Sequence, residues 1–169
     1  NKGDEVIIPA PFWVSYPDMV LLAGGKPKIV KCSETEGFKL TPQKLKKAIS
    51  KKTKWLILNS PSNPTGAGYT KNEIKNLSKV LIKNKKIHIL SDDIYEHITY
   101  DDFKFFTIAQ ISKLKSRTIT MNGVSKSYAM TGWRIGYAGG PKEIIKAIRK
   151  IQSQSTSNPS SVSQAAAVE

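Results

Sequence analysis

The sequence predicts an α/β domain built on a largely parallel β-sheet. Short apolar runs of strand length alternate along the chain with longer amphipathic segments, whose apolar residues recur at helical spacing. Strands that are separated by helical crossovers pair in parallel, and this order is typical of the α/β class. The chain has 169 residues, of which 39% are hydrophobic, so it is long enough to bury a substantial core.

Four elements are expected in the first part of the chain: a strand at residues 6–8, a helix at 15–23, a strand at 28–31 and a helix at 42–49. Pro9 and Pro11 should end the first strand, because proline lacks the N–H group that a sheet ladder uses. The glycine pair at residues 24–25 ends the first helix. Thr41 fits the N-cap of the second helix, with Pro42 at its first position.

Six elements are expected in the rest of the chain: a strand at residues 54–59, a helix that starts after Thr70, strands at 87–92, 117–121 and 134–138, and a helix at 141–152. Thr70 and Glu73 have the spacing of a capping box, and the apolar residues that follow them lie on one helical face. The residues that follow Met121, through Lys126, are expected to form a loop. Residues 153–163, rich in Ser, Thr and Asn, form the only linker-like stretch.

The net charge of +14 could indicate a protein that binds nucleic acid. However, most of the lysines lie on predicted helix faces, where lysine is a favourable solvated residue. The basic residues are also not interleaved with aromatic residues in the pattern that stacks on bases. We therefore expect no nucleic-acid partner.

The single cysteine, Cys32, excludes a disulfide within the chain and is expected to be a buried core residue. This usage fits a reducing, cytoplasmic setting. No apolar run approaches the roughly 20 residues that span a bilayer, so no membrane association is expected. The polar N-terminus does not resemble a signal peptide. The chain does not begin with Met and ends in a helical run without a stop signal, which predicts a fragment.

Three polar residues, Asn63, Asp92 and Lys126, follow the ends of predicted strands. In α/β sheets, ligands collect at the carboxyl ends of the strands. We therefore expect these three residues to lie at one ligand site.

Lys126 lies among small residues, and Arg134 follows eight residues later inside a second glycine-framed run. Small residues let a bulky ligand approach the backbone closely. A lysine whose pKa is lowered can form a Schiff base with a carbonyl group, and arginine offers a planar fork that matches phosphate. On spacing alone, such a pair is more often a surface lysine and a salt-bridged arginine.

Residues 123–136 resemble the signature of class I aminotransferases that attaches the cofactor pyridoxal 5'-phosphate (PLP). The resemblance implies that Lys126 holds PLP as a Schiff base, the internal aldimine, and that Arg134 binds the phosphate. Ser125 would donate its hydroxyl group to the same phosphate. Many relatives carry a second hydroxyl residue where this chain has Gly123, so the number of phosphate contacts stays open.

Two further motifs resemble elements of the same family. Residues 63–66, Asn-Pro-Thr-Gly, imply that Asn63 contacts the phenolic oxygen of PLP and the substrate's carboxylate. Residues 91–96 resemble its D-x-x-Y element, in which Asp92 pairs with the pyridine nitrogen and Tyr95 bonds the phenolic oxygen. Asp93 is the competing acid; if the strand continues, the two point to opposite faces, so only one can face the ring.

A third stretch, residues 9–17, resembles the segment that carries an aromatic side chain stacked on the pyridine ring. By position Trp13 takes that role and also borders the substrate. Trp55 and Trp133 match no such role, and we assign them to packing.

The resemblance covers nearly the whole chain and is closest to the bacterial aspartate aminotransferases. It implies a three-layer α/β/α sandwich, in which residues 1–169 are the central part of the large PLP-binding domain. It also implies a homodimer that moves an amino group from an amino acid, aspartate by closest resemblance, to a 2-oxo acid such as 2-oxoglutarate, by a ping-pong mechanism. The fragment alone should be inactive.

Two alternatives remain open. The first is another PLP enzyme of the same fold, such as an aromatic, alanine or prephenate aminotransferase. The second is an aminotransferase-like effector domain of a transcription regulator.

Overall fold

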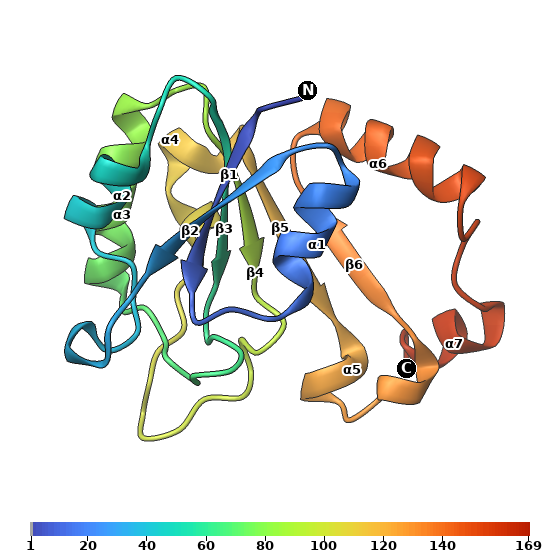
Figure 1. The fold of residues 1–169 in the computed structure, drawn as a ribbon. Coiled ribbons are helices and arrows are strands. Elements are labelled where there is room, and N and C mark those ends of the chain that lie inside the picture. The colour runs from blue at the N-terminus through green and yellow to red at the C-terminus, as the bar shows by residue number, and fades with distance from the viewer. Residues whose placement is uncertain (1) are drawn as a thin grey trace.

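A computed structural model describes residues 2–169 and contains one six-stranded sheet with the strand order β2-β1-β3-β4-β5-β6 (Figure 1). The strands are β1 (Glu5–Ala10), β2 (Lys26–Lys31), β3 (Thr53–Asn59), β4 (His88–Asp92), β5 (Thr118–Gly123) and β6 (Gly136–Gly139). The pairs within β1 to β5 are parallel, whereas β6 runs antiparallel to β5. The predicted α/β fold with a largely parallel sheet is confirmed.

Helices cover both faces of this sheet. The α-helices are α1 (Ser15–Leu22), α2 (Pro42–Ala48), α3 (Lys71–Lys83), α4 (Ser112–Lys115), α5 (Val124–Ser127), α6 (Lys142–Gln154) and α7 (Ser161–Ala166). Three short 3₁₀ helices are η1 (Glu34–Glu36), η2 (Ile108–Gln110) and η3 (Thr131–Trp133). Helices α2, α3 and α4 lie on one face, and α1 and α6 lie on the other (Figure 1).

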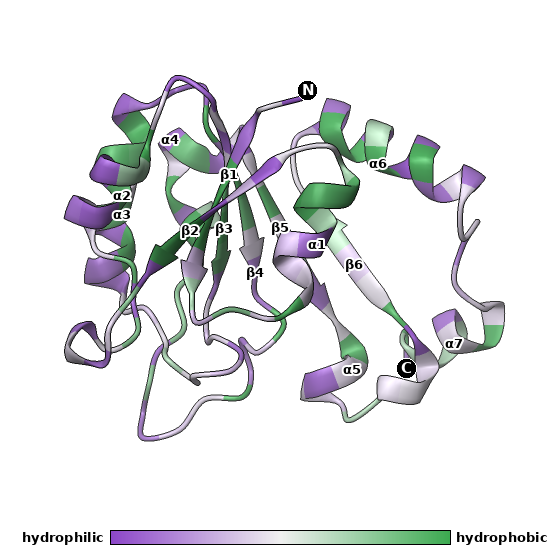
Figure 2. Ribbon diagram, viewed as in Figure 1, coloured by the Kyte–Doolittle hydropathy of each residue, from purple (hydrophilic) through white to green (hydrophobic). Residues whose placement is uncertain are grey.

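Alternating strand residues fill two cores, one on each face of the sheet. Ile7 and Leu56 belong to the larger core under α2 and α3, whereas Ile8 and Ile57 pack against α1. This is the period of two that a strand imposes on its side chains. Figure 2 shows hydrophilic residues on the outer side of α2 and α3, as the lysine-rich helical patterns predict.

Two helix starts form as the sequence predicts. The Thr41 side-chain oxygen accepts a hydrogen bond from the Lys44 backbone N–H at 3.2 Å. At the start of α3, Thr70 accepts a bond from the Glu73 N–H at 3.3 Å, and the Glu73 carboxylate accepts one from the Thr70 N–H at 2.7 Å. Each bond satisfies a backbone donor that the first helical turn leaves free.

The end of the first strand differs from the prediction, because β1 continues through Pro9 to Ala10. Pairing of β1 with β3 extends only from Glu5 to Ile7, while β2 accompanies β1 to its end. Beyond Ile7 the strand therefore has a neighbour on one side only, and at such a position a residue without an N–H group is tolerated.

The segment from 124 to 136 also differs from the prediction. Lys126 lies in the single-turn helix α5 rather than in a loop, and strand β6 starts at Gly136 rather than at Arg134. Arg134 has a left-handed backbone with φ of 57°, which a strand cannot contain. The stretch expected as a linker, residues 153–163, includes the end of α6 and the start of α7.

Cys32 is buried and free, as predicted. Within residues 2–169, no helix has both the length and the apolar character needed to cross a bilayer.

Candidate functional site

A cavity of about 280 Å³ lies at the carboxyl ends of β3, β4 and β5, and we call it the site cavity. All seven residues predicted to bind cofactor or substrate line it: Trp13, Asn63, Asp92, Tyr95, Ser125, Lys126 and Arg134. They come from segments that are more than 120 residues apart in sequence at the extremes, so the fold itself assembles them. The cavity lies where parallel strands end, which is where the sequence predicts a ligand site.

The side chains of Asp92 and Asp93 point to opposite faces of the sheet. Asp92 shares the face of Leu90, which packs in the α1 core, and it lines the site cavity. Asp93 accepts a hydrogen bond from the Ser91 hydroxyl at 2.7 Å and does not line the cavity. The alternation of strand side chains thus leaves Asp92 as the only one of the two acids that faces the site.

The Asp92 carboxylate is 5% exposed and is held by two donors. The Tyr16 hydroxyl donates to Oδ2 at 2.5 Å, and the Ile94 backbone N–H donates to Oδ1 at 3.3 Å. Burial raises the pKa of Asp92, and these two hydrogen bonds act in the opposite direction because they favour the ionised form. Burial, followed by the nearby Asp92 charge, raises the pKa of Tyr16 far above its usual range, so Tyr16 is a hydrogen-bond donor here.

The Asn59 side chain ties the Asn63 turn to the end of β4. Its carbonyl oxygen accepts a hydrogen bond from the Asn63 backbone N–H at 2.8 Å. Its amide donates to the Asp92 backbone oxygen at 2.9 Å. One side chain therefore fixes the spacing between two of the predicted cofactor ligands.

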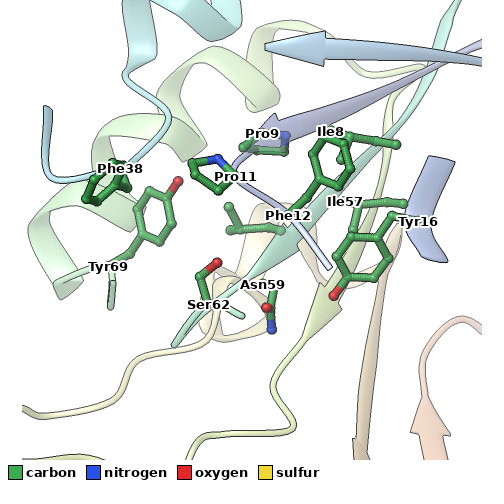
Figure 3. A pocket seen from close by; sticks show the side chains of 11 residues that line it. Ile8, Pro9, Pro11, Phe12, Tyr16, Phe38, Ile57, Asn59, Ser62 and Tyr69 are labelled. Atoms are coloured by element: carbon green, nitrogen blue, oxygen red, sulfur yellow. The ribbon is translucent and has the colours of Figure 1, made fainter. Parts of the chain in front are cut away.

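A second cavity of about 20 Å³ lies beside the site cavity and shares Tyr16 and Asn59 with it (Figure 3). Its volume is close to that of one water molecule. Figure 3 shows the polar ends of Tyr16 and Asn59 pointing away from the apolar group that contains Ile8 and Pro9. The two residues form the wall between the apolar core and the site cavity.

Lys126 and Tyr95 face each other across the site cavity. The Lys126 Nζ atom lies 5.9 Å from the centroid of the Tyr95 ring. Lys126 is exposed and lies in α5, which directly follows β5 in the connection to the antiparallel strand β6. Its amine is thus free to react with a carbonyl group that enters the cavity.

Ser125 and Arg134 provide hydrogen-bond donors for an anion on another side of the cavity. The Arg134 guanidinium is anchored by a 2.8 Å hydrogen bond to the Thr131 backbone oxygen. This bond uses one of the five N–H donors of arginine and leaves the rest of the fork for a ligand.

The packing around Gly123 leaves no room for a side chain at this position. A Cβ atom on Gly123 would lie 2.7 Å from the Ile135 backbone oxygen and 3.2 Å from the Gly136 Cα. The close approach of β5 and β6 therefore excludes a side chain here, and position 123 offers no hydroxyl group to a phosphate.

Trp13 stands at the edge of the site cavity just before α1, and its side chain is 37% exposed. Its ring meets the Tyr16 ring edge to face, with centroids 5.4 Å apart and planes at 86°. The partly exposed indole thus forms part of the cavity wall.

Tyr16 and Asn59 are the site residues that the sequence analysis missed. Asn59 ends a predicted strand, so the rule that singled out Asn63 and Asp92 could have identified it. No signal in the sequence pairs Tyr16 with Asp92, which is 76 residues away.

The groups that line the site cavity fit an aromatic aldehyde that carries a phosphate. Ser125 and Arg134 suit the phosphate, a buried carboxylate suits a ring nitrogen, and a lysine amine suits the aldehyde. No cluster of three or more metal-binding side chains occurs in the described part of the chain.

Comparison with known proteins agrees with this arrangement. The sequence profile of the family described as "Aminotransferase class I and II" matches residues 1–169. A curated relative from Rickettsia bellii, named "Probable aspartate/prephenate aminotransferase", is 63% identical over 170 residues, which cover 100% of this chain and 43% of the relative. The "Aspartate aminotransferase" of Rhizobium meliloti is 57% identical over 99% of this chain and 41% of its own length.

Solved structures give the same result for the fold. The crystal structure of the aspartate aminotransferase from Rhizobium meliloti superposes with a TM-score of 0.97 at 56% identity, covering 99% of this chain and 42% of that one. The Thermus thermophilus aspartate aminotransferase with maleate has a TM-score of 0.92 at 44% identity, covering 97% and 42%. The chain thus spans less than half the length of these relatives, and it belongs to the class I and II aminotransferase family.

Proposed function

We propose that this chain forms the central part of the large PLP-binding domain of a transaminase that moves an amino group from aspartate to a 2-oxo acid such as 2-oxoglutarate. The observation that carries the proposal is the convergence of all seven predicted ligand residues on one cavity. The names of the relatives from Rickettsia bellii and Rhizobium meliloti support aspartate as the donor.

Prephenate is the second candidate amino acceptor. The relative with 63% identity carries both aspartate and prephenate in its name, so the same site could serve a larger oxo acid. Assays with aspartate as donor and either 2-oxoglutarate or prephenate as acceptor distinguish the two.

PLP, when bound, supplies an electron-withdrawing ring that stabilises negative charge developing at the substrate's α-carbon. Asp92 would accept a hydrogen bond from the protonated ring nitrogen and hold the proton there. Asn63 and Tyr95 would donate to the phenolic oxygen. Ser125 and Arg134 would hold the phosphate, and Trp13 would cover one face of the ring.

Lys126 has two tasks in this proposal. Its Nζ atom is the covalent attachment point for the cofactor's aldehyde carbon. Once an incoming amino acid has displaced Lys126, its neutral amine can take a proton from the substrate's α-carbon. The same amine can then donate that proton to the cofactor carbon to which it had been attached. Two successive half-reactions at one site give ping-pong kinetics, the pattern that we expect for this protein.

We further propose a cytoplasmic homodimer, as the family resemblance implies. The dimer can be tested by analytical ultracentrifugation of the full-length protein with PLP. A monomer at micromolar concentration that retains full activity would contradict it.

The function is tested with the full-length protein and two lysine variants. Lys126→Ala should abolish transamination and the visible absorbance of bound PLP, because the amine is both attachment point and base. Lys150→Ala, which removes an exposed lysine from α6, is the matched control and should behave as wild type. Transamination by Lys126→Ala at the wild-type rate would refute the assignment.

A further inference from the structure

Tyr16 combines a core position with a polar contact to the candidate site. Its ring is 2% exposed and packs with Ile8 and Ile57 between α1 and the sheet. Its hydroxyl group leaves this apolar core and donates to the Asp92 carboxylate at 2.5 Å. A phenylalanine would fill the same volume, so packing alone does not require the hydroxyl group.

The hydroxyl group restricts how the carboxylate can lie. Oδ2 of Asp92 is bound by Tyr16 and Oδ1 by the Ile94 N–H, so rotation about the carboxyl bond would break both contacts. An ionised carboxylate has about four acceptor positions, so two donors leave capacity for a third that comes from the site cavity. The carboxylate is thus both fixed and open to a ligand.

The hydroxyl group also compensates the charge of a buried acid. Asp92 has no cationic partner in contact within the described residues. The titratable and charged groups around it are Tyr16 from α1, Tyr95 beyond the end of β4, Lys126 from α5, Arg134 after η3 and Asp93 on the opposite face. Of these, only Tyr16 makes a hydrogen bond to the carboxylate. Removing that bond would make the neutral acid more favourable.

We propose that Tyr16 is a positioning residue that holds the Asp92 carboxylate ionised and correctly oriented for the protonated ring nitrogen of PLP. This inference rests on the proposed function. Trp13 lies three residues earlier, just before α1, and its ring contacts the Tyr16 ring edge to face. The start of α1 would therefore position both the residue proposed to cover the PLP ring and the residue that supports Asp92.

The test compares two buried tyrosines in the full-length protein. Tyr16→Phe removes only the proposed contact. Tyr69→Phe is the matched control, because Tyr69 is also buried and its hydroxyl oxygen accepts a 2.6 Å bond from the Leu40 N–H, away from the site cavity. Both should lower the melting temperature, but only Tyr16→Phe should raise the dissociation constant of PLP, by roughly tenfold, the effect of a hydrogen bond to a charged group.

Two further readouts separate positioning from a general structural role. As the pH is lowered, the loss of PLP affinity should begin at a higher pH in Tyr16→Phe than in wild type. The reason is that the Asp92 carboxylate, without the hydrogen bond from Tyr16, protonates more readily. In an Asp92→Asn background, Tyr16→Phe should have no further effect on PLP affinity, because the group through which it acts is gone.

Wild-type PLP affinity and pH dependence in Tyr16→Phe would overturn the inference, as would a tenfold loss that persists in the Asp92→Asn background. The proposed function fails separately: in that case the wild-type protein itself neither binds PLP nor transaminates.

Discussion

Replacing Gly123 with alanine should destabilise the protein by about 1.5–4.5 kcal/mol. The new Cβ would lie 2.7 Å from the Ile135 backbone oxygen, whereas ordinary contacts begin near 3.4 Å, so the two strands must separate by about 0.7 Å. Such overpacking typically costs about 1–3 kcal/mol. The same carbonyl accepts the 3.3 Å bond from the Val124 N–H, and its loss adds roughly 0.5–1.5 kcal/mol.

The displacement should also weaken PLP binding. Ser125 and Lys126 follow Gly123 on one side of the strand pair, and Arg134 precedes Ile135 on the other. A shift between β5 and β6 therefore moves the phosphate ligands apart. Because a displacement of about 1 Å can cost a site on the order of a hundredfold, we expect at least a tenfold increase in the dissociation constant.

Urea denaturation of the full-length protein without cofactor, together with a PLP titration, measures both effects. Gly139→Ala is the control on the same strand pair, since its Cβ would meet only the Thr120 hydroxyl oxygen at 3.4 Å. The control should stay within about 1 kcal/mol of wild type. If Gly123→Ala unfolds at the wild-type midpoint, or if both variants are equally destabilised, the close approach of the strands is not what excludes a side chain.

Three other predictions concern single residues. Asp93→Asn should flatten the pH dependence of stability, because burial raises the pKa of Asp93 from 3.8 to about 6. The stabilisation by the neutral acid is fully present below pH 3.8 and is lost as pH rises through 6. In wild type the free energy of unfolding should therefore fall by roughly 3 kcal/mol between pH 4 and 7, measured by urea denaturation, and an unchanged slope in the variant would contradict this. Arg134→Gln should weaken PLP binding about 10- to 100-fold in an absorbance titration, because it removes a donor for the phosphate. Arg149→Gln, on exposed α6, is the control and should leave PLP binding unchanged. Equal losses of affinity in the two variants would refute a phosphate role for Arg134. Asn59→Ala removes two hydrogen bonds and should lower the free energy of unfolding by about 1–3 kcal/mol, measured by urea denaturation. A wild-type midpoint would show that these two bonds do not stabilise the fold.

The parts of the fold that depend on local pattern could be predicted from the sequence. Apolar runs located every strand, and the Thr70 capping box located the start of α3. The same period of two predicts that Asp92 and Asp93 point to opposite faces if the strand continues through them, and the structure shows this arrangement. These features follow from residues close together in the chain, so a sequence pattern contains them.

The features that could not be predicted depend on contacts between distant segments. Pro9 continues β1 because β3 pairs only with the strand's first half, which no local pattern reveals. The left-handed conformation of Arg134 and the single turn of α5 arise where β5 turns into the antiparallel β6. Tyr16 reaches Asp92 only because α1 packs on the sheet, and the two residues are 76 positions apart.

The motifs, by contrast, predicted a set of residues that the fold brings together around one cavity. Each predicted ligand was ambiguous alone, because an asparagine turn or an exposed lysine is common in any protein. Together, however, all seven predicted ligands line one cavity, whereas unrelated surface residues would be scattered over the molecule.

The identity of the lysine that binds PLP is the most direct test of the whole account. The full-length protein is incubated with PLP, reduced with borohydride to make the link permanent, digested and analysed by mass spectrometry. We predict that the pyridoxyl group is found on the peptide that contains Lys126. A modification on any other lysine, or none at all, would contradict the central claim.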